Sequence, residues 1–323
     1  MDILQITLFG CVRVTHNNWL TEVKLTREIQ ALLAYLLLQR HWAQPREVLA
    51  SIFWGELNQE RARGSLNTAL WKLKKALEPD GIPAGTYLIN NHPGEVGFNR
   101  ESQYWLDVEA FEEKTRHLSA CPLQMADETH VQELEKILGL YKGELFEGYY
   151  KDWALRERER LRALYLKSLK YLLEYYKLHG LYENGLACAQ QILNLDPLRE
   201  DIHREMMRLY LENGQRALAV RQYENCRKIL DTELSILPME ETQALFIQIF
   251  SKAHSGQLPM NSKEQISFDQ AIGQLREAGK TIDLAKEQIH QALQMIGKFS
   301  DHVEQTLPPK SNNKGYTEDL GRR

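Results

Sequence analysis

A chain of 323 residues is too long for one small domain and suits two domains with an extension. Its 43% hydrophobic and 26% charged residues describe an ordinary water-soluble protein, and the longest apolar run, Ala31 to Leu38, has 8 residues, which excludes a membrane span. The net charge of −4, with 10 Lys or Arg against 9 Asp or Glu in residues 1–99, excludes a globally basic domain.

The first hundred residues predict short strands followed by three helices. Ile3–Val14 alternates as short strands, and Trp19–Leu25 could hold another strand. Thr26 is a suitable N-cap for a helix whose apolar residues recur at helical spacing. A second helix is expected to start near Pro45 and to end at about Trp54.

The third predicted helix, Arg61–Leu77, has one apolar and one polar face. At about 100° per residue, the apolar face contains Ala62, Leu66, Leu70, Leu73 and Leu77. The opposite face contains Arg61, Thr68, Trp71, Lys72 and Lys75. Arg63 and Lys74 add to a cluster in which five cations lie within fifteen residues without an intervening acid. Because affinity for a polyanion depends on the phosphates that such a cluster reaches, this helix is the candidate DNA contact.

A two-stranded hairpin is predicted over Tyr87–Phe98, after the third helix is closed by Pro79-Asp80-Gly81. Strands, three helices and a hairpin, in that order, indicate a winged helix-turn-helix. The spacing of Thr26-Arg27-Glu28 before an apolar helix, of the segment Leu70–Leu77, and of the hairpin strands resembles the OmpR/PhoB-type DNA-binding domain.

This resemblance implies two sets of DNA contacts. The major-groove set is Thr68, Trp71, Lys72 and Lys75, and the set that serves mostly the DNA backbone is Arg61, Arg63 and Lys74. The family usually carries arginines where this chain has Lys72 and Lys74, and lysine makes a point contact instead of a bidentate fork. We therefore expect Lys72 and Lys74 to anchor phosphates more than to recognise guanine. The wing, residues 90–95, holds no Arg or Lys, which argues against insertion into the minor groove.

Some residues of the third helix have structural alternatives. Trp71 could contact a thymine methyl group or a sugar edge, or it could cover the gap between the helix and the wing, and we favour packing against the wing. A solvated polar face is the alternative for Thr68, Lys72 and Lys75. Asn67 is expected nearer the edge of the core, where its amide could satisfy backbone groups.

From Gln103 the pattern reads as helix, opening at Tyr104 and continuing nearly to Phe250. A shift of 34 residues superposes similar pairs within it: Leu172 on Met206, Tyr176 on Tyr210, Gly180 on Gly214, Gly185 on Ala219, Leu186 on Val220 and Leu195 on Ile229. That period is typical of tetratricopeptide helix pairs. Each pair leaves an apolar face that a neighbour must cover, so a third unit is expected upstream, from the stretches around Val131–Tyr141 and Trp153–Tyr176.

Four segments of this region resemble the bacterial transcriptional activation domain: Asp107–Glu112, Leu140–Gly148, Arg158–Leu161 and Asp196–Glu200. A winged helix joined directly to that domain is the architecture of the SARP family of regulators, which the chain resembles over roughly residues 1–250. In such regulators the repeat domain supports dimer formation and contacts with RNA polymerase, and the resemblance implies the same partners here.

Aromatic and charged residues near Gly148, within the repeat region, have two possible interpretations. Tyr149, Tyr150, Asp152 and Trp153 could serve contacts with partners, but we favour a packed hinge between helical units. The alternating charges of residues 157–160, Glu-Arg-Glu-Arg, are expected to form a solvated helix face.

The C-terminal region is predicted as a linker, a long helix and a disordered tail. Residues 251–265 form the linker, and residues 266–307 repeat apolar positions every seven residues, although half of the seam is polar or small. Two readings stay open for this helix, a weak dimerisation seam or a helix that folds back on the repeats. The tail, 308–323, is rich in Pro, Asn, Lys and Gly and is expected to be disordered.

No pattern for catalysis, metal or cofactor binding is found. The four cysteines and the histidines show no ligand spacing, and no serine or cysteine lies in a nucleophile motif. Residues 278–281, Ala-Gly-Lys-Thr, imitate the end of a phosphate-binding loop, but the nearest upstream glycine is one residue too far and no strand precedes it. We expect reduced thiols, no metal, no cofactor and no enzyme activity.

The prediction is a mainly α protein with a winged-helix domain over 1–100, a TPR-like activation domain over 103–250 and a C-terminal helical extension. The N-terminus lacks a basic region, so a cytoplasmic location is expected. The predicted function is a DNA-binding transcriptional regulator, an activator that binds repeated promoter half-sites as a dimer. Two alternatives stay open, a protein-interaction adaptor with a vestigial winged helix, and a regulator switched by its C-terminal helix.

Overall fold

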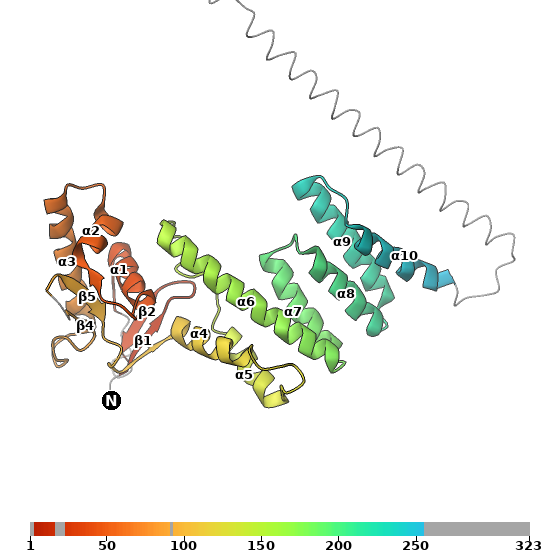
Figure 1. The fold of residues 1–323 in the computed structure, drawn as a ribbon, viewed down its shortest axis with the longest axis horizontal. Helices are drawn as coiled ribbons and strands as arrows, with labels where there is room; N and C mark the ends of the chain where they lie inside the picture. Colours follow the sequence, from red (N-terminus) through yellow and green to blue (C-terminus); the bar gives the residue numbers. More distant parts are fainter. Residues whose placement is uncertain (1–2, 17–22, 91–92, 255–323) are drawn as a thin grey trace, which may run out of the picture. The chain divides into compact units, whose positions relative to one another are not determined.

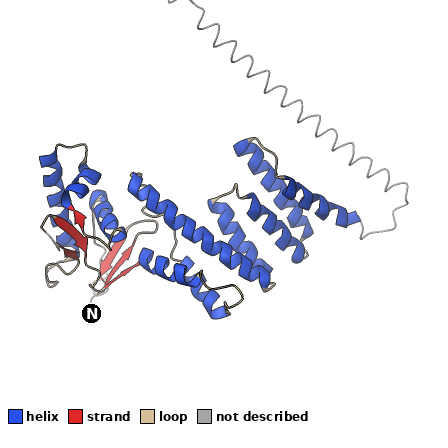
Figure 2. Cartoon of the chain, in the orientation of Figure 1, coloured by secondary structure: helices blue, strands red, loops and turns tan. Residues whose placement is uncertain are grey.

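The computed structural model describes residues 3–16, 23–90 and 93–254. The described residues up to Ser251 belong to one compact unit, and residues 252–254 belong to a second unit. The described residues are mainly helical, with short strands confined to the N-terminal part (Figure 2). This agrees with the predicted fold class. The predicted tail, the seven-residue repeat and the Ala-Gly-Lys-Thr motif lie outside the described residues.

The first sheet joins the two predicted domains. Strand β1 (Leu4–Thr7) pairs antiparallel with β2 (Arg13–His16) and parallel with β6 (Tyr104–Leu106). The prediction of helix from Tyr104 is therefore wrong for three residues, because the free edge of β1 offers backbone partners that a helix at this point would leave unpaired. Of the proposed additional strand, Val23–Leu25 form none and residues 17–22 lie outside the described part.

Three helices follow in the predicted order: α1 (Arg27–Leu38), α2 (Arg46–Trp54) and α3 (Gln59–Leu77). Helix α1 is buried along its apolar residues, as its spacing predicts. Helix α3 begins two residues earlier than predicted, because the side chain of Asn58 accepts a hydrogen bond from the Arg61 amide at 2.9 Å and caps the helix.

The wing is a small three-stranded sheet beside α3 (Figure 1). The predicted hairpin is present as β4 (Leu88–Ile89) and β5 (Glu95–Phe98), which pair antiparallel. A short strand before α2, β3 (Gln44–Pro45), adds to the other edge of β5. The wing is thereby tied to the start of α2 as well as to α3.

The helical region contains α4 (Asp107–Leu118), α5 (Glu128–Leu138), α6 (Asp152–Leu178), α7 (Tyr182–Leu195), α8 (Glu200–Glu212), α9 (Arg216–Leu234) and α10 (Glu240–His254). The 34-residue period is visible in its turns, since Gly180 follows α6 with φ 69° and Gly214 follows α8 with φ 71°. Only glycine adopts this backbone without strain. Helix α10 continues through residues 251–254, so the start of the predicted linker is wrong.

Backbone hydrogen bonds connect the segment after β1 to the loop before α6. The amide of Gly10 donates to the Glu144 carbonyl at 2.8 Å, and the amide of Phe146 donates to the Leu8 carbonyl at 2.9 Å. The carboxylate of Asp107 accepts from the amides of Leu8 and Phe9 at 2.9 and 3.0 Å. The winged helix and the repeats are therefore joined by long-range backbone contacts as well as by the chain.

The junction before and within α6 corrects the predictions for two residues and supports the prediction for a third. Arg158 is 6% exposed and donates to the carbonyls of Leu145, Phe146 and Tyr149 at 3.2 Å. The prediction of a solvated face is wrong for Arg158, because the loop carbonyls need donors that the loop itself does not supply. Trp153 lies against Tyr35 of α1, with ring centroids 5.3 Å apart, so it packs as favoured, although against the winged helix. The packed interpretation is wrong for Tyr150, which is 75% exposed.

Candidate nucleic-acid interface

Helix α3 carries a broad exposed surface above a continuous apolar one. Its buried residues are Ala62, Leu66, Ala69, Leu70, Leu73 and Leu77. All the predicted DNA contacts are exposed: Arg61, Arg63, Thr68, Trp71, Lys72, Lys74 and Lys75. We call this set, together with Gly64 and Asn67 between its members, the α3 surface. Helical periodicity places Arg61, Lys72 and Lys75 near one flank of this surface and Arg63 and Lys74 on the other.

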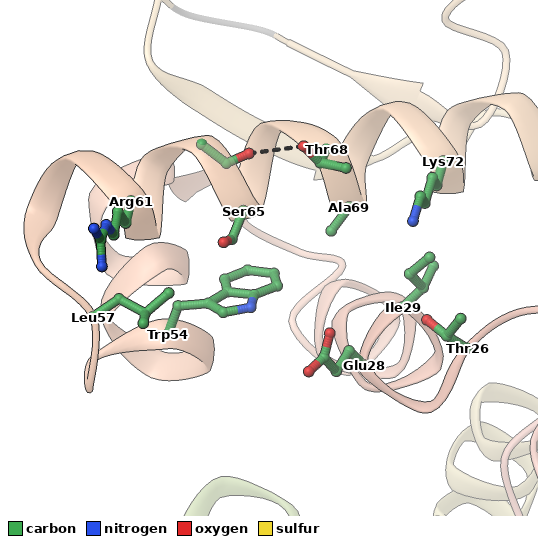
Figure 3. A pocket seen from close by; sticks show the side chains of 11 residues that line it. Thr26, Glu28, Ile29, Trp54, Leu57, Arg61, Ser65, Thr68, Ala69 and Lys72 are labelled. Carbon is green, nitrogen blue, oxygen red and sulfur yellow. Dashed lines mark hydrogen bonds between the residues drawn. The ribbon is translucent and has the colours of Figure 1, made fainter.

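One flank of the α3 surface faces the start of α1 and the end of α2 (Figure 3). A hollow of about 500 Å³ lies there, bordered by the cations Arg61 and Lys72 and by the carboxylate of Glu28. The Thr68 hydroxyl donates to the Gly64 carbonyl at 3.0 Å, so its oxygen keeps lone pairs for an external donor. Trp54 forms the apolar floor between the helices.

The other flank faces the wing across a cleft of about 260 Å³. The cleft is lined by Arg46, Asn67, Leu70, Trp71, Lys74, Leu88, Asn90 and Val96. Trp71 borders this cleft but is 62% exposed, so the favoured prediction that it packs against the wing is wrong. The Lys75 ammonium lies 5.4 Å from the centroid of the Trp71 ring, a cation–π contact that holds the indole on the exposed side.

Arg63 is the one residue of the predicted set with an ion pair among the described residues. Its guanidinium lies 2.5 Å from a carboxylate oxygen of Glu47, in the first turn of α2, and the two side chains are 53% and 71% exposed. Exposed pairs of this kind are worth roughly 0–1 kcal/mol. A phosphate can therefore compete with Glu47 for Arg63 at small cost.

Sequence reasoning missed Arg46 and misplaced Asn67. Arg46, in the first turn of α2, donates from Nη1 to Asn67 Oδ1 at 2.9 Å and from Nη2 to Asn90 Oδ1 at 3.4 Å. The backbone amide of Arg46 donates to the Gly94 carbonyl of the wing at 2.8 Å. Asn67 is exposed and bonded to a side chain, not to the backbone groups that the sequence suggested. In the sequence, the charged pair Arg46-Glu47 at the start of the second predicted helix was the feature that could have pointed to Arg46.

Residues 106–250 match the bacterial transcriptional activator domain family. The chain is also similar to Regulatory protein AfsR of Streptomyces griseus, with 26% identity over 247 residues that cover 76% of this chain and 24% of that protein. Transcriptional regulatory protein MoaR1 of Mycobacterium tuberculosis is 24% identical over 251 residues, which are 73% of this chain and 74% of MoaR1. Residues 106–250 thus match a transcriptional activator domain, and the chain is similar to proteins named as regulators of transcription. It spans about a quarter of the length of its AfsR relatives.

The fold of this chain is similar to that of a solved structure, Mycobacterium tuberculosis EmbR in complex with a low affinity phosphopeptide. The similarity has a TM-score of 0.59 at 19% identity and covers 84% of this chain and 70% of EmbR. At this identity the match concerns the fold. It supports the arrangement of a winged helix followed by TPR-like helices.

The described residues contain neither a cluster of metal ligands nor a helix that could cross a bilayer. Among residues 3–16, 23–90 and 93–254, no three His, Cys, Asp or Glu side chains are grouped as metal ligands. In the same residues, every helix is too short or too polar to cross a bilayer.

Proposed function

We propose that the α3 surface enters the major groove of duplex DNA and that the chain is a sequence-specific transcriptional regulator. The observation that carries this proposal is the exposure of five cations, on both flanks of the α3 surface, on a helix whose remaining side is anchored in the core. Only one of these cations, Arg63, is paired with a carboxylate among the described residues. An unpaired row of cations on a rigid helix is suited to phosphates and base edges.

Position on the α3 surface divides the proposed roles. Thr68, Trp71 and Lys75 lie near its middle and would face base edges together with Lys72. The phosphates of the two DNA strands that border the groove would be contacted by Arg61, at the start of the helix, and by Arg63 and Lys74, on the wing side. Because three of the five cations are lysines, which act as point charges, these cations contribute affinity more than base discrimination.

The repeat region supplies the rest of the proposal. Residues 106–250 match a family described as a transcriptional activator domain, which supports activation over repression. We propose that this region binds a second copy of the chain, so that two α3 surfaces reach repeated half-sites, and that it contacts RNA polymerase. The proposal is regulatory, not enzymatic, and places the protein in the cytoplasm.

The test is DNA binding as a function of salt, measured by fluorescence anisotropy on the promoter of the chain's own gene. Changing Lys72 and Lys75 together to Ala is expected to weaken binding on all sequences and to flatten the plot of log affinity against log salt by up to about two units. The matched control changes Lys136 and Lys167 to Ala, which removes the same charge from exposed sites outside α3. Equal slopes for the two double variants would contradict the assignment.

The same experiment separates the alternative function. The wing segment 90–95 carries no cation, which favours a protein-interaction adaptor over a DNA-binding protein. Absence of any shift at low salt, together with recovery of a defined partner by the repeats, would support the adaptor.

A further inference from the structure

The hydrogen bond between Arg46 and Asn67 determines which way the Asn67 amide points. A guanidinium has only donors, so the amide atom that faces it must be the carbonyl oxygen. Asn67 Oδ1 lies 2.9 Å from Arg46 Nη1, and the amino group, Nδ2, is therefore turned away from Arg46. Within the described residues, Asn67 Nδ2 donates to no other group. Two N–H donors are thus left available on the exposed side of α3.

We infer that Asn67 reads a base edge that offers acceptors, namely guanine, in the major groove. The inference rests on the proposed DNA binding by the α3 surface and adds to it a specificity-determining residue. Asn67 lies next to Thr68 and one turn before Trp71, on the same exposed surface. It is also an uncharged side chain among cations, so its contribution is base discrimination and not counterion release.

Guanine is distinguished from adenine by the pattern of its major-groove edge. Guanine presents two adjacent acceptors, N7 and O6, whereas adenine presents the N7 acceptor beside the N6 amino donor. A free asparagine binds adenine in bidentate fashion, donating to N7 and accepting from N6. Arg46 takes one lone pair of the Asn67 oxygen and holds this oxygen toward α2, so the oxygen is turned away from the position that the adenine N6 contact requires. The amino group alone donates well to guanine and meets a repelling donor on adenine.

Arg46 acts in this inference as a positioning residue. It is half-buried, begins α2 and also reaches Asn90, at 3.4 Å, while its backbone amide is bonded to Gly94. These contacts hold the guanidinium between α3 and the wing in one place. Loss of Arg46 would release the Asn67 amide to rotate and expose its oxygen.

The experiment measures binding of the full chain to footprinted half-sites in which each base pair is replaced in turn. For the wild-type chain we expect one guanine per half-site whose replacement by adenine weakens binding roughly tenfold, as a good base contact does. Asn67→Ala should bring that ratio close to one at this position and leave the other positions unchanged. Asn67 is exposed, so this variant is expected to fold.

Substitutions of Arg46 test the positioning role. Arg46→Met removes the donors, so adenine should become equal to or better than guanine at the same position. Arg46→Lys restores a donor and should restore the preference for guanine. Thermal unfolding and the unchanged preference at other positions report that each variant is folded.

The outcomes separate this inference from the proposed function. If every base preference of Asn67→Ala stays within about twofold of the wild-type value, base recognition by Asn67 is overturned and the proposed DNA binding stands. A preference lost in Asn67→Ala but unchanged in Arg46→Met would overturn the positioning by Arg46. A wild-type chain that binds no duplex at low salt would remove the proposed function, and the inference with it.

Discussion

His203 lies buried in the repeats as a neutral imidazole that is held at both ring nitrogens. Its Nε2 donates to the Pro197 carbonyl at 3.0 Å, and its Nδ1 accepts from the Gln222 amide at 2.7 Å. Burial lowers the pKa of His203 from the ordinary value of 6.5. As the pH falls below that value, the unfolded chain therefore binds a proton that the folded chain does not, and folding is disfavoured.

We expect His203 to make the repeats less stable in mild acid. The free energy of unfolding should fall as the pH is lowered from about 7.5 to about 5.5, since the unfolded state is protonated first. His203→Gln keeps a donor for Pro197 but does not titrate. The difference in unfolding free energy between wild type and this variant, measured by urea denaturation, should shrink toward acid. A difference that is constant over this range would rule the linkage out.

Asp107 connects the start of α4 to the segment after β1. Its carboxylate accepts hydrogen bonds from the amides of Leu8, Phe9 and Val108 at 2.7 to 3.0 Å and is 2% exposed. Burial raises the pKa of this carboxyl, and the three amides oppose the rise by stabilising the charged form. Among the described residues, backbone amides and not a paired cation stabilise the charged form of this carboxyl.

Asp107→Asn is expected to lower the free energy of unfolding by about 1–3 kcal/mol, because its amino group would face a buried backbone N–H. The control is Asp127→Asn at the exposed N-cap of α5, where Asp127 accepts from the His130 amide at 2.7 Å. Asn and Asp are nearly equivalent at such a cap. Chemical denaturation measures both variants, and equal losses would contradict the role of Asp107.

At the scale of elements, the sequence predicts contacts along one helix better than contacts between segments. The faces of α3 could be predicted because helical periodicity is local, and the Asn58 cap shifts only its first turn. Strand β6 and the place of Arg46 could not, since both depend on partners far along the chain: β1 for the strand, and Asn67 and Asn90 for the arginine. The exposure of Trp71 likewise depends on how far the wing lies from α3.

Gly64 is an exposed glycine within α3, next to the cations. A Cβ built there meets no atom within 4 Å, so the protein itself does not require glycine at this position. Glycine in a helix costs roughly 0.5–1 kcal/mol relative to alanine. An unfavourable residue on the α3 surface is consistent with close approach of the DNA to the helix backbone.

Gly64→Ala should therefore raise the free energy of unfolding by about 0.5–1 kcal/mol and weaken DNA binding severalfold. Thermal unfolding and anisotropy titration measure the two effects on the same preparation. Gly185→Ala is the control, because its Cβ would lie 3.2 Å from Leu209 Cδ1 and cancel the gain from helix propensity. If Gly64→Ala bound DNA as tightly as wild type, close approach at Gly64 would be excluded.

At the scale of the whole described unit, the winged helix and the repeats share one hydrophobic core. Residues from Leu4 to Leu209 form a single cluster of buried side chains. At the junction, Arg40, which follows α1, is paired with Glu109 and Glu112 of α4 at 2.8 and 3.2 Å, and Glu112 is also paired with Arg160 of α6. Because Arg40 and Glu112 are buried, breaking the network would leave a buried charge without a partner. The repeats thus hold the helix that we propose to bind DNA.

A fragment of residues 1–100 is therefore expected not to fold alone, although the predicted domain boundary lies there. It lacks β6, so β1 loses its parallel partner, and it lacks Asp107, which accepts from the amides that follow β1. Extension to residue 118 restores both features with α4, and this fragment should regain a cooperative thermal transition. Far-UV circular dichroism during heating compares the two fragments with residues 1–251. A cooperative transition for 1–100 at the same temperature as for 1–118 would show that the winged helix is independent of the repeats, and α3 would then be free to move relative to them.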